Sequence, residues 1–279
     1  MERLRPKKGL GQNFLSDTNI IARIVESAGI TTDDHVLEIG PGRGALTGAI
    51  AGRGAKVLAM ELDRRLVPLL EEEFAGLENV EIVQGDVLEA DLREMLLARH
   101  QGKWKVAANL PYNISSQVLL KFIDNRALFS RLVLMLQREV GERLIAPCGC
   151  KEYGILTLFC RLHFDVRREF IVRPGSFFPV PKVDSVVLGF QPLPAPRVDV
   201  GEEGFFRSLV RAAFSHRRKT LWNCLKGQNY APDGEGLMEV LAGCGIDPGR
   251  RGETLSLEEF AGLSRALINL ESGKDEGCK

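Results

Sequence analysis

The tetrapeptide NLPY at residues 109–112 places two hydrogen-bond acceptors, a rigid turn and an aromatic ring side by side. The side-chain oxygen of Asn109 and the backbone carbonyl of Leu110 can hold the two N–H groups of an exocyclic amine such as N6 of adenine. The lone pair of this nitrogen is otherwise delocalised into the adenine ring. When both N–H groups are held, the lone pair can point at the methyl carbon of a methyl donor. Pro111 stiffens the turn, and Tyr112 offers a face on which a flipped base can stack. The tetrapeptide alone is equally compatible with a turn that carries a packed tyrosine.

Three glycines, Gly40, Gly42 and Gly44, lie between an apolar run and a helical segment in VLEIGPGRGALT. Because they lack a Cβ atom, their backbone can approach a ligand closely. The loop lacks the GK[ST] ending of a phosphate-binding loop and falls short of the full dinucleotide fingerprint. A tight turn without a ligand would explain it as well, so alone it is a weak signal.

Two carboxylates follow the next apolar runs of the chain. Glu61 stands where an acidic side chain can accept hydrogen bonds from both hydroxyls of a ribose. Asp86, in GDVLEAD, is expected at the same edge of the sheet, where it can accept a hydrogen bond from an adenine amino group. A charge at a helix N-terminus is the alternative role for each acid. With the glycines, the acids predict a nucleotide site and leave S-adenosylmethionine and NAD undecided.

The segments around these residues alternate between short apolar runs and helical patterns. Strands are expected at 35–39, 55–62, 80–86, 104–110 and 131–137, and helices at 16–30, 45–54, 64–76, 92–99, 115–123 and 138–146. Such alternation predicts an α/β fold with a mostly parallel sheet and helices on both faces. The glycine loop, both acids and the tetrapeptide should then meet at the carboxyl edge of that sheet.

The order of elements changes after Cys150. A helix is expected near 154–162, and two β-rich runs at 164–172 and 183–191 flank a turn-rich stretch and predict a closing hairpin. The proline-rich segment QPLPAPRVDV separates these runs from a remainder with helical periodicity. We therefore expect an α/β domain over 1–193 and a small all-helical domain over 194–279.

The composition fits a globular protein, with 44% hydrophobic and 27% charged residues. Because 37 basic and 37 acidic residues cancel, binding to nucleic acid would have to rest on local basic clusters. The cysteines form no CxxC pair, which favours reduced thiols over a zinc site. No signal peptide and no membrane span is apparent, so we expect a cytoplasmic protein that contacts no membrane.

The complete set of motifs closely resembles the ribosomal RNA adenine dimethyltransferase family, and within it the small-subunit branch. The likeness covers nearly the whole chain. It rests on GQNFL at 11–15, VLEIGPGRGALT, Glu61 in MELD, GDVLEAD, NLPYNIS, LMLQREVGERL, FFPVPKVDS and FSHRRKTLWNCL, in the expected order. The resemblance implies a Rossmann-like class I methyltransferase sheet that binds S-adenosylmethionine, followed by a small helical C-terminal domain that binds RNA.

The same resemblance implies N6,N6-dimethylation of two adjacent adenines in the 3′-terminal stem-loop of small-subunit (16S) RNA during ribosome biogenesis. The implied partner is this RNA within a pre-assembled 30S-type particle, and we expect the protein to act as a monomer. The implied cofactor-binding residues are Asn13, Leu15, Gly40, Glu61, Asp86 and Asn109. The implied catalytic residues are Asn109, Leu110, Tyr112 and Phe177. Phe177 is expected opposite Tyr112, although the adjacent Phe178 could confuse that assignment.

The expected reaction is an in-line displacement at a flipped adenine. As N6 attacks the methyl carbon, positive charge develops on nitrogen, and the acceptors on Asn109 and Leu110 stabilise that charge. Neither a general base nor a metal is needed, since loss of the proton can follow methyl transfer.

Two basic clusters are candidates for holding RNA. The first comprises Arg207, Arg211, Arg217, Arg218 and Lys219. The spacing of Arg207, Arg211 and Arg218 indicates a phosphate-tracking helix, for which a solvated helix face is the alternative. The second cluster, close to GQNFL, comprises Arg3, Arg5, Lys7 and Lys8.

Other activities share part of this pattern. A DNA adenine methyltransferase would have the tetrapeptide, but the chain has no evident target-recognition domain. A large-subunit RNA methyltransferase of the resistance type is the nearest alternative, against which GQNFL and RRKTLWNCL favour the small-subunit branch. A mainly non-catalytic ribosome assembly factor is a different class, and the filled catalytic positions favour an active enzyme. An NAD oxidoreductase is disfavoured because no hydride-transfer constellation accompanies the glycine loop.

Overall fold

The computed structural model describes residues 6–7, 9, 11–228, 230 and 234–275. The chain divides into two compact units. The first unit comprises Met1–Glu142 and Phe164–Pro192, and the second comprises Arg143–His163 and Leu193–Lys279. The glycine loop, the two acids and the tetrapeptide all belong to the first unit.

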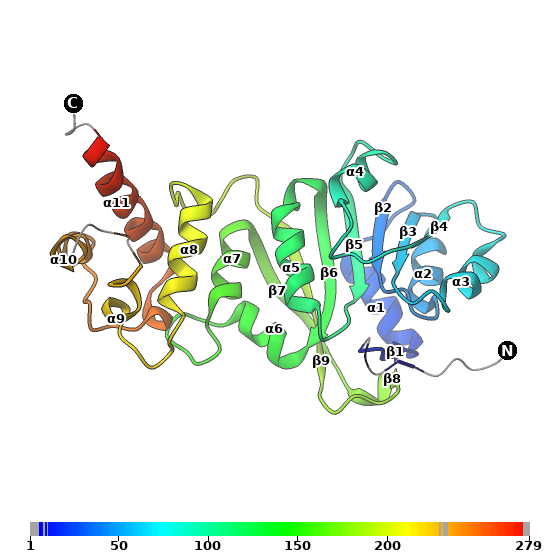
Figure 1. The fold of residues 1–279 in the computed structure, drawn as a ribbon. Coiled ribbons are helices and arrows are strands. Elements are labelled where there is room, and N and C mark those ends of the chain that lie inside the picture. The colour runs from blue at the N-terminus through cyan, green and yellow to red at the C-terminus, as the bar shows by residue number, and fades with distance from the viewer. Residues whose placement is uncertain (1–5, 8, 10, 229, 231–233, 276–279) are drawn as a thin grey trace. The chain divides into compact units, whose positions relative to one another are not determined.

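A seven-stranded sheet with the order β4-β3-β2-β5-β6-β9-β7 forms the centre of the first unit (Figure 1). Strands β2 to β6 are parallel, whereas β9 is antiparallel to both β6 and β7. The strands are β2 (His35–Ile39), β3 (Lys56–Glu61), β4 (Val80–Gln84), β5 (Trp104–Asn109), β6 (Phe129–Gln137), β7 (Phe164–Val172) and β9 (Ser185–Pro192). The mostly parallel α/β sheet and the antiparallel pairing of the two β-rich runs are thus confirmed.

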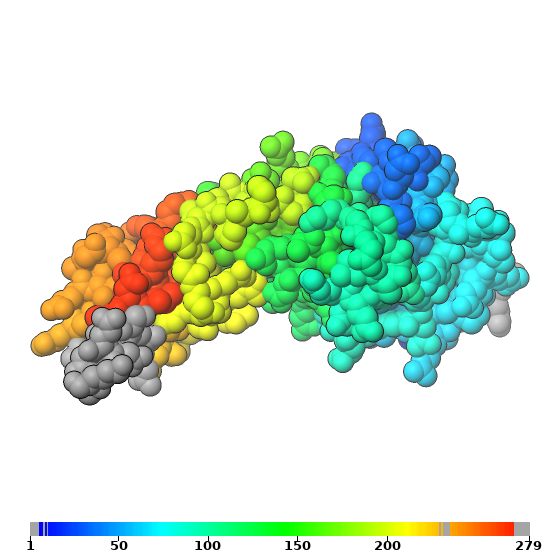
Figure 2. All heavy atoms as spheres, turned by 90° about the horizontal axis from the view of Figure 1, so that it is seen from above, coloured from blue at the N-terminus to red at the C-terminus, as the bar shows by residue number. Residues whose placement is uncertain are grey.

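Helices cover both faces of this sheet. They are α1 (Thr18–Ala28), α2 (Ala45–Ala51), α3 (Val67–Phe74), α4 (Leu92–Leu97), α5 (Ser115–Asp124) and the start of α6 (Arg138–Ile145). Val133 and Met135 of β6 pack into a core cluster with α1 and α2. Leu132 and Leu134, which alternate with them and so face the other side, are equally buried. Figure 2 draws all heavy atoms of the chain as spheres, seen from above the view of Figure 1.

Local sequence signals account for the ends of α1. The Asp17 side chain accepts hydrogen bonds from the backbone N–H groups of Asn19 and Ile20 at the first turn. Gly29 closes the helix in the left-handed conformation, with φ 58°, which glycine adopts without a Cβ clash. The predicted helix at 16–30 therefore forms with its expected start and stop.

A second, two-stranded sheet joins the beginning of the chain to the segment before β9. Strand β1 (Phe14–Leu15) pairs antiparallel with β8 (Phe177–Phe178), so that Phe14 lies opposite Phe178. A short turn, η3 (Pro174–Ser176), leads into β8. This pairing fixes the GQNFL segment against a part of the chain more than a hundred residues later.

The described part of the second unit consists of helices and turns. Its helices are the end of α6, α7 (Ile155–His163), α8 (Glu203–Ala213), α9 (Leu221–Leu225), α10 (Gly234–Gly243), α11 (Leu257–Asp275) and the short η4 (Gly252–Thr254). Aromatic side chains form much of its core, including the pair Phe214 and Phe260 with ring centroids 6.1 Å apart. The buried Tyr153 hydroxyl donates to the Leu255 carbonyl at 3.0 Å.

The compact units and the expected domains share a boundary near residue 193 and differ in one segment. Residues 143–163, which precede β7, group with the C-terminal helices rather than with the sheet. The division of roles between 1–193 and 194–279 stays a prediction. In the described ranges, no helix has both the length and the apolarity needed to cross a bilayer.

Close packing of α6 on β9 generates a stability prediction. A Cβ atom on Gly141 would lie 2.2 Å from Cγ1 of Val186, so Gly141→Ala should overpack this contact and destabilise the protein by about 1–3 kcal/mol. Gly48→Ala in α2 is the matched control, because its Cβ would meet Phe74 at an ordinary 3.6 Å. Urea unfolding of both variants checks this, and equal midpoints would contradict it.

Candidate active site

An open cavity lies at the carboxyl edge of the parallel strands in the first unit, where ligands of such sheets bind. It holds about 1040 Å³ of empty space, including solvent at its mouth. Of the residues implied to bind cofactor or target, those that line it are Asn13, Leu15, Gly40, Glu61, Asp86, Asn109, Leu110 and Tyr112. The structure therefore brings together residues from five separate segments of the chain.

The glycine loop between β2 and α2 requires glycine at each of its three positions. Gly40, Gly42 and Gly44 have φ values of 68°, 60° and 80°, which side chains with a Cβ atom rarely adopt. A Cβ on Gly42 would also lie 2.8 Å from the Phe14 ring, and one on Gly44 would lie 2.7 Å from the Phe74 ring. The loop thus permits β1 and α3 to pack closely around the cavity.

Glu61, the last residue of β3, is 5% exposed and holds two backbone segments. Its Oε2 accepts from the Gly42 N–H at 3.1 Å, and its Oε1 accepts from the Asp63 N–H at 2.8 Å. Burial raises the pKa of this carboxyl group, and the backbone hydrogen bonds act in the opposite direction. Because each carboxylate oxygen can accept more than one hydrogen bond, Glu61 can also accept from a ligand's hydroxyls.

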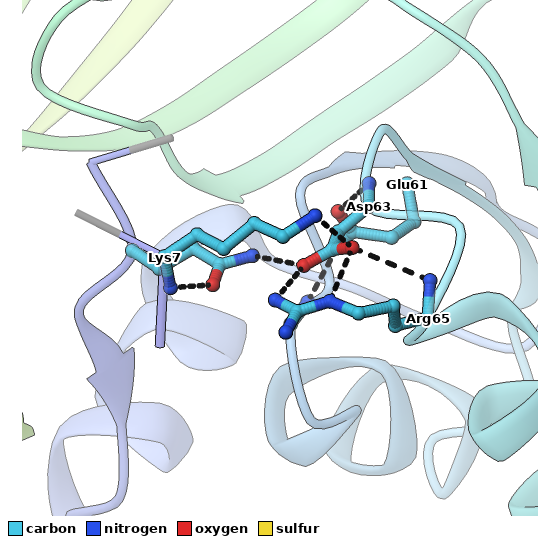
Figure 3. Close-up of polar contacts among 6 residues, drawn as sticks. Lys7, Glu61, Asp63 and Arg65 are labelled. Atoms are coloured by element: carbon cyan, nitrogen blue, oxygen red, sulfur yellow. Dashed lines mark hydrogen bonds and ion pairs between the residues drawn. The ribbon is translucent and has the colours of Figure 1, made fainter. Parts of the chain in front are cut away.

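Asp63 forms a polar cluster beside Glu61 (Figure 3). Its side chain is 1% exposed and accepts from Arg65 Nη2 at 2.7 Å, Arg65 Nε at 3.0 Å and Gln12 Nε2 at 3.1 Å. Lys7 Nζ lies 3.4 Å from the same carboxylate. Hydrogen bonds from Arg65 above all hold the pKa of Asp63 far below its usual range. Sequence reasoning missed this residue, although an acid two positions after Glu61 was visible in MELD.

This cluster attaches the N-terminal segment to the cavity wall. Gln12 uses its amide N–H to bind Asp63 and its amide oxygen to accept the Lys7 backbone N–H at 2.7 Å. Residues 11–15, which follow directly, line the cavity. Asp63 therefore sets the position of the segment that contains Asn13 and Leu15.

Asp86 and the tetrapeptide lie further along the same edge. Asp86 Oδ1 caps the turn after β4 by accepting from the Leu88 N–H at 2.9 Å. The Asn109 side-chain N–H donates to the Asn13 carbonyl at 3.0 Å, which leaves Oδ1 as the acceptor of that amide. Leu110 is buried, and its backbone N–H donates to the Met135 carbonyl at 3.2 Å. These bonds hold the tetrapeptide from both sides.

The Tyr112 ring is fixed by a long-range contact. Its hydroxyl lies 2.7 Å from the hydroxyl of Ser185, the first residue of β9, and Ser185 is fully buried. Burial raises the pKa of Tyr112, so the phenol stays protonated and able to share this hydrogen bond. Sequence reasoning did not find Ser185, since nothing local links it to residue 112.

Phe177 and Phe178 differ sharply in exposure. Phe177 is 2% exposed and belongs to the core cluster on the α1 side of the sheet, whereas Phe178 is 54% exposed. Successive side chains of a strand point to opposite sides, so β8 can bury only one of the two rings. A base could reach Phe177 only if the surrounding core moved, and its assignment opposite Tyr112 stays a prediction.

Glu38 is a second buried acid at the cavity that sequence reasoning missed. It is 1% exposed, lines the cavity, and accepts a hydrogen bond from Thr47 Oγ1 at 2.6 Å. Burial raises its pKa to about 8. In the sequence it stands within an apolar strand, VLEI, where its carboxylate could have been noted as an exception to the pattern.

The basic residues of the second unit do not form one helical strip. Helix α8 ends at Ala213, so Arg217, Arg218 and Lys219 lie in the turn before α9, and the predicted helix through Arg218 is wrong. Phe214, at the C-cap, donates its N–H to Val210 and leaves the helix, because the segment SHRRK that follows has no apolar residue to continue the buried stripe.

Arg207 is a poor candidate for a phosphate contact. It pairs with Glu203 at 2.7 Å and lies over the Phe159 ring, 5.5 Å from the centroid. Arg217 pairs with Glu253 at 3.5 Å and donates to the Lys151 carbonyl. Arg211, Arg218 and Lys219 are exposed, although the Arg211 guanidinium also lies 5.6 Å from the centroid of the Phe159 ring. In the N-terminal cluster, Arg3, Arg5 and Lys8 lie outside the described residues.

The fold and the cavity define an α/β enzyme of the Rossmann-like methyltransferase class. The model of the family described as "Ribosomal RNA adenine dimethylase" matches residues 3–262, and the chain belongs to this family. No set of three or more His, Cys, Asp or Glu side chains that could hold a metal ion occurs among the residues that were described.

Individual relatives extend this result. The chain is 62% identical to "Ribosomal RNA small subunit methyltransferase A" of Geobacter metallireducens, over 96% of this chain and 98% of that one. It is 45% identical to the protein of the same name from Bacillus mycoides, over 94% and 91%. Among solved structures, a dimethyladenosine transferase from Plasmodium falciparum matches with TM-score 0.80 and 28% identity, covering 92% of this chain and 98% of that one. The 23S rRNA methyltransferase ErmE matches with TM-score 0.67 and 26% identity, covering 92% and 100%.

The raised pKa of Glu38 predicts how Glu38→Gln changes stability with pH. In the folded protein, with a pKa of about 8, the Glu38 carboxyl group retains a proton that it releases near pH 4.5 in the unfolded chain. The native protein therefore loses stability as the pH rises between these values. The glutamine variant lacks this loss, and its stability relative to the native protein should rise by at most about 1.4 kcal/mol per pH unit. Urea unfolding at pH 5.5 and 7.5 tests this, with Glu71→Gln at an exposed position of α3 as the charge control. A stability difference between Glu38→Gln and the native protein that is the same at both pH values would refute the prediction.

The Asp63 cluster predicts how the N-terminal segment is held. In Asp63→Asn the amide cannot form ion pairs with Lys7 and Arg65, and we expect amide hydrogen exchange in residues 11–15 to accelerate several-fold. Arg65→Gln is the matched control, because it leaves the contacts of Asp63 with Lys7 and Gln12 in place. Equal exchange in Asp63→Asn and the native protein would show that the cluster does not hold the segment.

Proposed function

We propose that this chain transfers methyl groups from S-adenosylmethionine to N6 of adenine in small-subunit ribosomal RNA. The product is N6,N6-dimethyladenosine at two adjacent adenines of the 3′-terminal stem-loop. The observation that carries the proposal is the convergence of Glu61, Asp86 and the NLPY tetrapeptide on one cavity. Family membership and the names of the full-length relatives support it.

The residues at the cavity fit S-adenosylmethionine. In this proposal Glu61 accepts from the ribose hydroxyls, Asp86 accepts from the adenine amino group, and Gly40 borders the methionine part. A Cβ on Gly40 would have no atom nearer than 3.8 Å, so hydrogen at this position leaves room for a ligand. Asn13 and Leu15 close the cavity from the N-terminal side, where Asp63 anchors their segment.

The cofactor supplies a methyl group activated by a sulfonium centre. The chain's residues orient the acceptor: Asn109 Oδ1 and the Leu110 carbonyl accept the two N6 hydrogens, which directs the nitrogen lone pair at the methyl carbon. As the new N–C bond forms and the S–C bond breaks, positive charge grows on N6, and both acceptors stabilise it. The proton then leaves N6 for solvent. The once-methylated nitrogen keeps one hydrogen, so in the second transfer one of the two acceptors holds it while the lone pair again points at the methyl carbon.

Tyr112 holds the flipped base from one side. Its ring stacks on the adenine, and the hydrogen bond to Ser185 keeps that ring from rotating away. Pre-positioning of this kind lowers the entropy lost when the target base enters the site.

Further parts of the proposal concern the partner. We propose that the exposed Arg211, Arg218 and Lys219, with lesser parts for Arg207 and Arg217, contact phosphates of the RNA within a 30S-type particle. The region 194–279 would then be the RNA-binding part of a monomeric cytoplasmic enzyme. Such contacts set affinity and position rather than base identity.

The decisive experiment is transfer of labelled methyl groups to unmethylated small subunits, followed by digestion to nucleosides. We expect N6,N6-dimethyladenosine, and a loss of rate of about 100-fold or more in Asn109→Ala. Asn19→Ala, at an exposed position on α1, is the matched control and should keep full activity.

Each other outcome identifies a competing function. Label that enters only large-subunit RNA would assign the chain to the resistance-type branch, whereas label in DNA would point to a DNA methyltransferase. Cofactor binding without any transfer would favour a non-catalytic assembly factor.

A further inference from the structure

Residues 178–183, which we name the apolar loop, present large apolar side chains to solvent. Phe178, Val180 and Val183 are 54%, 65% and 45% exposed. They are three of the seven large hydrophobic residues found exposed in the described ranges, gathered within six positions. Pro179 and Pro181 restrict the backbone between them. Apolar groups gathered in this way on a protein surface mark a place where a partner binds.

The apolar loop runs between two segments that each contact a residue lining the cavity. It begins in β8, where Phe178 pairs with Phe14 of the cavity-lining β1. It ends just before Ser185, whose hydroxyl binds that of Tyr112. Figure 1 shows the chain between β8 and β9 as a long connection that projects beyond the end of the sheet.

Positive charge accompanies the apolar side chains. The Arg43 guanidinium lies 5.8 Å from the centre of the Phe178 ring and 5.0 Å from that of Phe14. Lys182 is exposed within the loop itself. Asp184, the acid at the end of the loop, is paired with Arg138 at 3.3 Å and with Arg173 at 2.9 Å. Apolar faces next to cationic groups match the bases and phosphates of a nucleic acid.

We propose that the apolar loop inserts into the RNA beside the target adenine. Phe178 stacks on the base that the flipped adenine leaves without a neighbour, Val180 covers its edge, and Lys182 contacts the adjoining phosphate. The inference rests on the proposed function and adds a surface for the flanking nucleotides to it. Unstacking a base is unfavourable, and a side chain that fills the gap offsets part of this cost.

The exposure of the two phenylalanines favours Phe178 for this task. Phe177 is already committed to the core, so Phe178 is the ring of β8 with a face available to a base. Tyr112 then stacks on the target and Phe178 on its neighbour. The side chains of the loop act on the RNA, and none of them lines the cofactor cavity.

The test compares Phe178→Ala, Phe178→Trp and the control Leu77→Ala, which removes an apolar side chain after α3 that is 44% exposed, against 54% for Phe178. Affinity is measured by fluorescence anisotropy for a naked RNA hairpin with two adjacent adenines in its loop. KM is measured with small-subunit particles, and S-adenosylmethionine affinity by calorimetry. Thermal melting shows that each variant is folded.

We expect Phe178→Ala to weaken hairpin binding and raise KM about tenfold, because stacking on one base is worth about that factor. Phe178→Trp should keep native values, as should Leu77→Ala, and cofactor affinity should not change. A 2-aminopurine at the target position should fluoresce less with Phe178→Ala, because fewer bases are flipped. Val180→Ser should give the same changes to a smaller extent.

Several results would overturn the inference. Unchanged hairpin affinity and KM in Phe178→Ala would exclude insertion. A raised KM for particles with unchanged hairpin affinity would assign the loop to a ribosomal protein instead, and weakened cofactor binding would assign it to the cavity. If the native protein methylates no particles, the proposed function fails, and the hairpin measurement still decides the role of the loop.

Discussion

The hydrogen bonds of Glu61 are the constraint on which the rest of the site depends. One carboxylate oxygen fixes the glycine loop through Gly42, and the other fixes the start of the next turn through Asp63. Asp63 in turn holds Gln12, and the segment after Gln12 supplies the carbonyl that binds Asn109. Four segments far apart in the sequence are thus positioned by a continuous set of contacts that begins at one buried acid.

The sequence was most informative where function depends on strand ends. Parallel strands share a carboxyl edge, so the positions of Glu61, Asp86 and Asn109 after three apolar runs were enough to place them at one cavity. It was least informative for contacts between distant residues. The Tyr112–Ser185 hydrogen bond and the grouping of 143–163 with later helices depend on tertiary packing, which leaves no local pattern in the sequence.

The burial of acidic side chains was the second feature that the sequence did not predict. Glu38 interrupts an apolar run and Asp63 stands two positions after Glu61, but nothing local shows that both are at most 2% exposed or that their pKa values are displaced in opposite directions. The difference lies in their partners: Glu38 has a neutral hydroxyl from Thr47, whereas Asp63 has a guanidinium. The guanidinium belongs to a residue two positions after Asp63 and the hydroxyl to one nine positions after Glu38, so both partners are near in the chain, and only coordinates show that these side chains meet and that each acid is buried.

The two-stranded sheet of β1 and β8 has a thermodynamic consequence for an enzyme with two substrates. In the proposed function, β1 closes over the cofactor and the loop that follows β8 contacts the RNA, and because β1 and β8 are paired backbone to backbone, ordering one restrains the other. The conformational entropy of this ordering is lost only once, when the first of the two ligands binds. Cofactor and RNA should therefore bind with positive cooperativity, and by linkage each must strengthen the other by the same factor.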